Sequence, residues 1–477
     1  MPLEPPSVNE PPLADAPALP PGRPWIAWGV IVAVAVWIIW HHSQEDPPAK
    51  KAAEQRLFGP IADWQARYLV GAAKLFPEKE GRQFATAAPV DNGPIEQRLR
   101  AVVVVGEISG PQEATEKLTM VEKALDDVKA RETASTLRRV YGDLADGKPA
   151  LPSLDPADRK RLVDRLGWSG NLALHPANGP DETGRKALLG EAKATFAKSV
   201  ALFGAIGVLG LGGLGALLSI VVLLLVRPQS RRLASPTQHG GVYAETFAVW
   251  MVLYLGLSFA AGYLPVGQNR LLLTAAVMLA SLAALGWPVL RGIPWQVVRD
   301  EMGLYLGRWP LVELALGPMA YLAALPLLVI GVIVIAVLLA IQRAIVGDTG
   351  TAFDQNLPSH PIVGWLLGGD WWQKAQVIFL ASVMAPLMEE TMFRGALYRH
   401  LRDVTHRFVF ATSVLTSGLG VSFLFAVIHP QGWIAVPVLM ALALAFALIR
   451  EWRGTLLAAM LAHGINNLVV TCVLISI

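Results

Sequence analysis

The sequence has little cysteine and little charge for its length. A single cysteine, Cys472, occurs among 477 residues, and it lies inside an apolar run. One cysteine excludes a disulfide within the chain and also a metal site built from several thiolates. Charged residues make up only 16% of the chain, whereas a soluble domain usually carries about a quarter. This deficit indicates that much of the chain is buried in an apolar solvent.

Apolar residues are abundant, at 53% of the chain, and they gather in runs long enough to cross a bilayer. The runs cover residues 25–41, 199–226, 243–264, 271–290, 311–341, 375–398, 408–429, 433–449 and 455–476. We therefore predict an all-α, polytopic membrane helix bundle with membrane lipid as its main partner. The net charge of +3 is too small to indicate a nucleic-acid partner.

The apolar runs and the segments between them divide the chain into five predicted parts. Residues 1–24 hold nine prolines and are predicted to be a disordered tail. The run at 25–41 is predicted to be a retained signal anchor, because no small-residue cleavage site follows it. Residues 199–290 add further membrane helices, and residues 291–477 carry the polar motifs described below.

Residues 44–195 are charged, punctuated by proline and free of any spanning run. They predict an inserted helical soluble domain, in which Asp155 followed by Pro156 is typical of a helix start. No catalytic constellation is recognisable in this domain. This domain could bind a protein partner.

Arginines recur at every second connection between the predicted spans. They are Arg227, Arg231 and Arg232, then Arg291, Arg299 and Arg308, then Arg399, Arg402 and Arg407, and finally Arg450 and Arg453. Basic loops favour the cytoplasm, so we expect a multi-pass protein of the cell inner membrane with the 44–195 domain outside the cytoplasm. Lys50, Lys51 and Arg56 oppose this orientation locally, but four consistent loops outweigh one.

One predicted span is crowded with glycine. The glycines are Gly207, Gly210, Gly212, Gly213 and Gly215. Small residues let membrane helices approach closely, so we expect these glycines to serve helix packing.

Three ionisable residues lie inside the apolar run at 375–398: Glu389, Glu390 and Arg394. Such residues are costly in a membrane unless paired, and they mark functional sites. Glu390 and Arg394 are four residues apart, so they share a helix face and can form an ion pair. Glu389 projects about 100° away from Glu390, which leaves it available as a base.

Two histidines and an asparagine follow on later runs. His429 ends one run, and His463 precedes Asn467 by one helical turn. Each has an ordinary structural explanation, as an interfacial histidine or as a hydrogen-bonded pair that joins helices. Together with Glu389 they suit hydrolysis of an amide, which needs an activated water and donors for the oxyanion. We expect Glu389 and His429 to hold the water, and His463 with Asn467 to face the oxyanion.

The same residues leave the question of a metal open. Glu389, His429 and His463 are residue types that ligate zinc, and their spacing does not separate a zinc site from a metal-free glutamate mechanism. The H-E-x-x-H pattern of zincins is absent.

Three motifs in this order resemble the CPBP family, which comprises CAAX prenyl endopeptidases of the Ras-converting type and bacterial Abi-like, bacteriocin-processing proteins. The motifs are Glu389-Glu390-x-x-x-Arg394, Phe425-x-x-x-His429 and His463-x-x-x-Asn467. The resemblance covers roughly residues 290–477 and implies an intramembrane endopeptidase that cleaves a peptide or protein substrate. It also implies Glu389 as the water-activating base, His429 as its partner, and oxyanion roles for His463 and Asn467. Members have been described both as metalloproteases and as glutamate-dependent enzymes, so the resemblance does not decide on zinc.

Two other functions compete with hydrolysis. The polar cluster could pack helices in a non-catalytic scaffold or immunity-type protein, or it could relay protons in a transporter, although no inverted repeat is evident. Counting also places Glu389 and His429 at different depths. They can meet only if the 375–398 helix runs on past Arg394 and the 408–429 helix is broken, bent or shallow. Ser417-Gly418-Leu419-Gly420 offers a place to break, because glycine weakens a helix.

Overall fold

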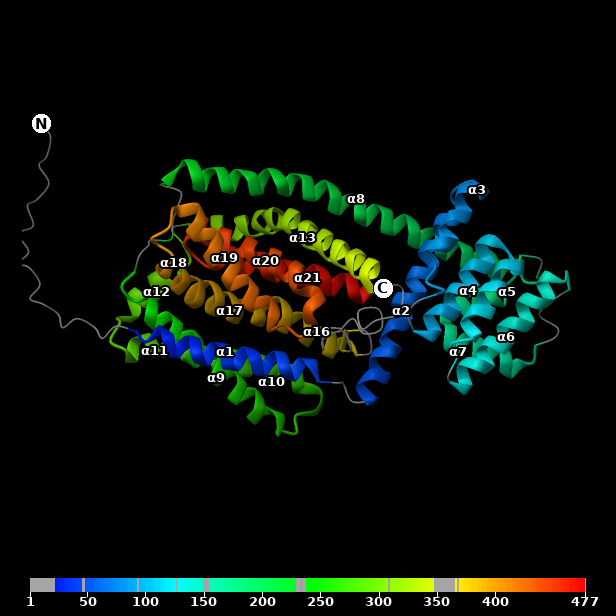
Figure 1. The fold of residues 1–477 in the computed structure, drawn as a ribbon, viewed down its shortest axis with the longest axis horizontal. Coiled ribbons are helices and arrows are strands. Elements are labelled where there is room, and N and C mark those ends of the chain that lie inside the picture. The colour runs from blue at the N-terminus through cyan, green and yellow to red at the C-terminus, as the bar shows by residue number, and fades with distance from the viewer. Residues whose placement is uncertain are drawn as a thin grey trace, which may run out of the picture.

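The computed structural model describes a helical protein in which two groups of helices are joined by one long helix (Figure 1). The described residues are 22–44, 48–91, 94–125, 127–148, 154–177, 179–228, 233, 237–307, 309–346, 365–366 and 369–476. Within these ranges there is no strand, which confirms the predicted all-α class. The tail at 1–21, Arg231, Arg232 and Arg308 lie outside the described residues.

The first group is a helical domain with a core of its own. Its helices are α2 (Pro48–Ala73), α3 (Glu78–Gly81), α4 (Ile95–Ser109), α5 (Pro111–Glu122), α6 (Val128–Ala145) and α7 (Pro156–Ala173). Apolar side chains such as Val70, Leu99 and Leu137 are fully buried between them. The Asp155 side chain accepts a hydrogen bond from Asp158 N at 2.7 Å, so the predicted helix start is present.

A single helix, α8 (Glu182–Val226), joins this domain to the second group. It runs without interruption for 45 residues, across the predicted boundary near residue 195. Its first part packs against α2, where a Cβ on Gly71 would overlap the Ala192 carbonyl. Its later, apolar part packs against α13 (Pro310–Val346). The placement of the domain relative to the bundle is therefore fixed along α8.

The second group is the membrane bundle. Besides α8 and α13 it contains α1 (Pro24–Ser43), α9 (Gly240–Gly262), α10 (Arg270–Ser281), α11 (Gly286–Leu290), α12 (Trp295–Met302), α16 (Trp371–Phe379), α17 (Ala385–Glu389), α18 (Tyr398–Val404), α19 (Phe410–Val427), α20 (Gly432–Arg453) and α21 (Leu457–Ser476). In the described part of the chain, nine helices are long and apolar enough to cross a membrane. The predicted number of spans is thereby confirmed. Within one apolar 18-residue stretch of each helix, 61% of the residues are buried in Trp371–Val404, whereas 17% are buried in α8 and in α13. The motif-bearing helix therefore lies at the centre.

This central helix contains two π-helical segments, η6 (Leu380–Met384) and η7 (Glu390–Leu397). Pro386 lacks an N–H and so provides no donor for the Ser382 carbonyl one turn earlier, and wider π-type bonding accommodates such a gap. Gly464 of α21 packs directly on that carbonyl, since a Cβ there would lie 2.5 Å from Ser382 O. The irregular backbone thus brings α21 close to the central helix.

The predicted break in α19 is wrong. The helix continues from Phe410 to Val427 through the whole Ser-Gly-Leu-Gly segment. Ser417 Oγ instead shares a hydrogen bond with Thr405 Oγ1 at 2.8 Å, and a Cβ on Gly418 would lie 2.7 Å from Leu444 Cδ1. These small residues therefore serve contacts with neighbouring helices, which one sequence cannot distinguish from a break.

The arginine-rich ends of the spans gather at one end of the bundle, next to α12 and α18 (Figure 1). Several of these arginines are buried and paired. Arg402 Nε donates to Glu451 at 2.5 Å, and Arg450 Nη2 donates to the Glu301 carbonyl at 2.9 Å. We call this the α12–α18 end, and the opposite end of the bundle carries the helical domain.

Only one glycine of the predicted packing cluster in α8 makes a close helix contact. A Cβ on Gly213 would overlap the carbonyl oxygen of Leu322 in α13. The others, Gly207, Gly210, Gly212 and Gly215, have nothing within 4 Å of a Cβ. The expectation that the whole cluster serves packing is wrong, because only one of the five positions faces α13.

Gly213→Ala is expected to destabilise the protein, because the new methyl group forces α8 away from α13 and overpacking of this kind costs about 1–3 kcal/mol. Gly212→Ala is the matched control, and it should be neutral or slightly stabilising because alanine favours helix. The check is the thermal unfolding midpoint of each variant in lipid nanodiscs. Equal midpoints for the two variants would contradict the contact.

Candidate active site

Glu390 is the centre of a fully buried polar network. Its Oε1 accepts a hydrogen bond from Arg394 Nη1 at 3.0 Å, within the same helix turn. The same oxygen lies 2.9 Å from His463 Nδ1 of α21. Glu390 and Arg394 have no exposed surface, so the ion pair predicted from their spacing is present and shielded from water.

Arg394 also ties the central helix to two others. Its Nη2 donates to the Ala443 carbonyl of α20 at 2.9 Å. Its guanidinium carbon lies 5.0 Å from the centre of the Phe425 ring and 5.4 Å from that of Phe446. Aromatic faces attract a cation, so the arginine charge is compensated on several sides.

Glu389 projects to a different side of the helix from Glu390, as the helical geometry predicts. Its side chain is 14% exposed, whereas that of Glu390 is 0% exposed. Glu389 Oε2 lies 3.7 Å from His463 Nε2, which is too long for a hydrogen bond. His463 therefore lies between the two glutamates. Its Nδ1 is bonded to Glu390, and its Nε2 faces Glu389.

His429 lies in the turn that follows α19, beside the same group of side chains. Its Nδ1 is 2.5 Å from the Phe425 carbonyl, so Nδ1–H donates there and Nε2 carries the lone pair in the neutral ring. Its ring centre lies 4.1 Å from that of Phe425, and Phe425 in turn lies 6.2 Å from the His463 ring. One aromatic side chain thus separates the two histidines.

Asn467 lies one turn beyond His463 and is bonded to the central helix. Its Nδ2 donates to the Ala381 carbonyl in η6 at 2.8 Å, and its Oδ1 accepts from Asn466 at 3.1 Å. One amide hydrogen of Asn467 thus holds α21 against η6. The structure therefore places Asn467 beside the cluster, but with part of its carboxamide committed to packing.

Two side chains that the motifs do not contain complete the surroundings. Phe446 of α20 stacks on the His463 ring, with centres 5.1 Å apart and an angle of 23°. Tyr254 of α9 lies near Glu389. Aromatic residues in apolar helices are usually core residues. Nothing in the sequence therefore marks Phe446 and Tyr254 as neighbours of the candidate site.

The candidate metal ligands do not form a set as they are arranged. Among the residues that the structure describes, no three His, Cys, Asp or Glu side chains are placed to hold a metal ion. Nδ1 of His463 is committed to Glu390 and Nδ1 of His429 to a carbonyl. These bonds leave Nε2 of each ring as the potential ligand atom, as metal-ligating histidines commonly have it, but Glu389, His429 and His463 are not gathered around one point in the described structure.

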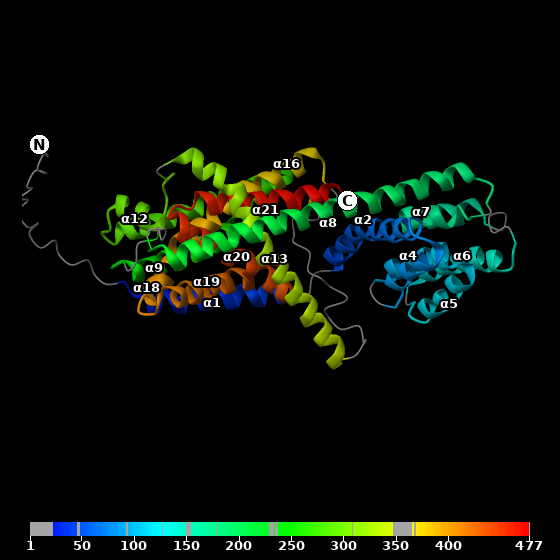
Figure 2. The same cartoon turned by 90° about the horizontal axis from the view of Figure 1, so that it is seen from above.

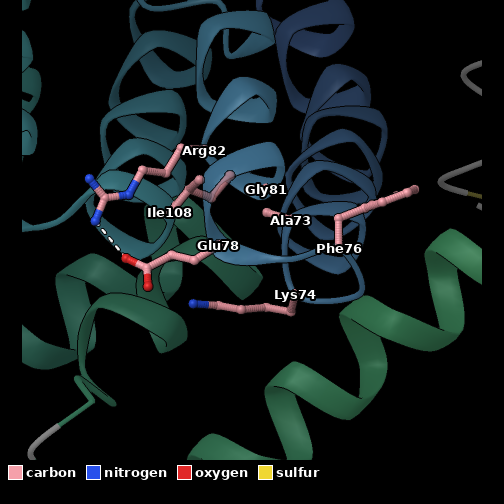
Figure 3. A pocket seen from close by; sticks show the side chains of 7 residues that line it. All are labelled: Ala73, Lys74, Phe76, Glu78, Gly81, Arg82 and Ile108. Carbon is pink, nitrogen blue, oxygen red and sulfur yellow. Dashed lines mark hydrogen bonds and ion pairs between the residues drawn. The ribbon is translucent and has the colours of Figure 1, made fainter.

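A surface pocket in the helical domain lies away from this cluster (Figure 3). It is lined by Ala73, Lys74, Phe76, Glu78, Gly81, Arg82 and Ile108. Arg82 is paired with Glu78 across it at 2.6 Å, and both side chains are exposed. The pocket therefore offers no buried charge comparable with that of the membrane cluster.

The fold and the site define a polytopic membrane protein with an acid–imidazole cluster buried among its helices. Residues 371–469 match the family model of type II CAAX prenyl endopeptidases, Rce1-like. The matched segment runs from α16 into α21 and includes all six candidate residues. The predicted resemblance to this protease family is confirmed for the segment. No curated protein and no solved structure matches the chain.

The two adjacent glutamates should differ sharply in their effect on stability. Glu390→Ala leaves Arg394 and His463 without their shared carboxylate, and breaking a buried ion pair costs about 3–5 kcal/mol. Glu389→Ala removes a partly exposed side chain with a longer contact, so we expect a small change. Thermal unfolding of both variants in nanodiscs measures the difference. A similar loss in the two variants would show that Glu390 is not the structural member of the pair.

Proposed function

We propose that this protein is an intramembrane endopeptidase that hydrolyses a peptide bond in a membrane-associated protein or peptide. The observation that carries the proposal is the facing pair of Glu389 and His463, 3.7 Å apart, within the segment that matches a protease family. A scaffold that used these residues only for packing would have no reason to leave one carboxylate partly exposed beside a buried network.

Glu389 acts as the general base in this proposal. It takes a proton from a water molecule, whose oxygen attacks the carbonyl carbon of the scissile peptide bond. His429 helps to hold that water through Nε2, since its Nδ1–H is bonded to the Phe425 carbonyl. The proton held by Glu389 then passes to the amide nitrogen as the C–N bond breaks, so that no proton is gained or lost overall.

His463 stabilises the oxyanion that forms during the attack. When it is protonated, its Nδ1–H donates to Glu390 and its Nε2–H is free to donate to the oxyanion. The Glu390 carboxylate, whose charge Arg394 balances, holds the imidazole ring in this orientation. Asn467 offers its second amide hydrogen to the same oxygen.

The orientation in the membrane is also a proposal. We infer that the α12–α18 end faces the cytoplasm of a cell with an inner membrane, because the arginine-rich ends of the spans gather there (Figure 1). The helical domain then lies outside the cytoplasm, where it is available to a protein partner.

Loss of the base should abolish cleavage while the protein still inserts and purifies normally. We expect Glu389→Ala and His429→Ala each to lower the cleavage rate by about 10²–10⁴, the usual contribution of acid–base catalysis. The measurement is quantitative mass spectrometry of new peptide termini in membranes that contain each variant. His406→Ala is the matched control, because His406 is an exposed histidine outside the cluster.

The outcome of that comparison also separates the rival functions. A set of termini that depends on Glu389 and His429 but not on His406 supports hydrolysis. Identical termini in the original protein and in Glu389→Ala, with both proteins folded, would leave a scaffold as the better explanation.

A further inference from the structure

Helix α1 covers a seam in the bundle beside the candidate site. It packs along α9 and also touches α19, and Figure 2 shows it beside α19. Both α9 and α19 contact η7, the segment that carries Glu390 and Arg394. We call the junction of these two helices the α9–α19 seam. Because α1 lies outside the matched segment, its position there is a feature of this chain.

Polar bonds hold α1 at the α12–α18 end. The backbone N–H of Arg23 donates to Glu245 Oε1 at 2.5 Å. Trp28 Nε1 donates to His400 Nε2 at 3.0 Å, next to the end of η7. Hydrogen bonds between helices are hard to exchange for lipid, because hydrocarbon has no donors or acceptors. This end of α1 is therefore fixed.

The next turns of α1 are held by apolar contacts instead of hydrogen bonds. From Ile31 to Val36 every side chain is apolar, and Ile31 and Ala35 are buried in the seam while Val32 and Val36 are more than half exposed. Lipid tails offer an apolar helix nearly the same environment as a protein surface, so packing of this kind has little hydrophobic driving force in a membrane. This part of α1 can leave the seam at a much lower free-energy cost than the Trp28 turn.

The weakly held turns lie at the depth of the candidate base. Gly22 lies against Gly241, where a Cβ would overlap the backbone, and α1 and α9 both run from the α12–α18 end toward the other end of the bundle (Figure 1). Both helices rise by about 1.5 Å per residue, and the two residues before α1 add at most a few Å, so Ala35 comes within about one helical turn of the level of Tyr254. Tyr254 is an α9 side chain that lies near Glu389.

We propose that the α9–α19 seam is the lateral docking surface for an apolar helical segment of the substrate, and that α1 is a gate over it that hinges near Trp28. The proposal rests on the proposed function for the identity of the occupant. The seam already holds one apolar helix whose buried positions are small or slender, Ala27, Ile31 and Ala35, so a second helix of the same character fits it. The next helix along the chain after α1 is α2 of the helical domain.

Spin labels can test the gate without any need for catalysis. In a Cys472→Ala background, one nitroxide is attached at a time to Val30→Cys, Trp37→Cys or Ile38→Cys in nanodiscs. Val30 and Ile38 are both partly buried against the core. Val30 lies near the proposed hinge, whereas Ile38 lies beyond it. Trp37 is 47% exposed. The probe is a synthetic leucine–alanine helix of about 20 residues, long enough to span the bilayer. A short water-soluble peptide serves as the control ligand.

We expect the Ile38 label to show an immobile and a mobile component, and the mobile fraction to rise severalfold as the apolar helix is added. The Val30 label should stay immobile and the Trp37 label mobile throughout. An Ile38 label that remains immobile at every concentration would overturn the gate, as would equal mobilisation of Val30, since α1 would then leave as a whole. Repeating the titration with Glu389→Ala separates the two proposals, because gate opening should persist in that variant even if no substrate is ever cleaved.

Discussion

The structure depends on one carboxylate that is held between an arginine and a histidine with no access to water. An ionised group in an apolar medium is costly unless opposite charge and hydrogen bonds surround it. Glu390 meets this requirement with Arg394 from its own helix and His463 from α21. Arg394 is compensated further by a carbonyl of α20 and by two aromatic rings. Four helices, the central helix with α19, α20 and α21, must therefore be in place before the charges can be buried.

This network gives the two neighbouring glutamates different chemistry. Each residue turns a helix by about 100°, so Glu389 projects away from the Glu390–Arg394 ion pair and has only the longer contact with His463. Glu389 is left with a partly exposed carboxylate that faces the other nitrogen of the same imidazole. The orientation of His463 is set by the structural glutamate, and its free nitrogen is aimed at the candidate base. One histidine thus couples the part of the cluster that holds the helices together to the part that could perform hydrolysis.

Local contacts of this network could be predicted from the sequence, whereas contacts between helices could not. The Glu390–Arg394 pair follows from a spacing of four residues, and the nine spans follow from the length of the apolar runs. His463 is 73 residues from Glu390, so only the fold reveals that they share a bond. The same reason explains the two wrong expectations. Ser417 and Gly418 look like helix breakers in isolation, and Gly212 looks like a packing residue, until the neighbouring helices are known.

The helical domain is connected to the bundle through two helices that are held in different ways. Along α8 the backbone is continuous, and glycine contacts lock it to α2 on one side and to α13 on the other. Along α1 the polar bonds lie only near Arg23 and Trp28, far from the domain. A force on the domain would therefore be resisted by α8 and taken up by the apolar turns of α1. In the proposed gate, those turns would be the part of α1 that moves away from α9 and α19, which both contact the segment that carries Glu390 and Arg394.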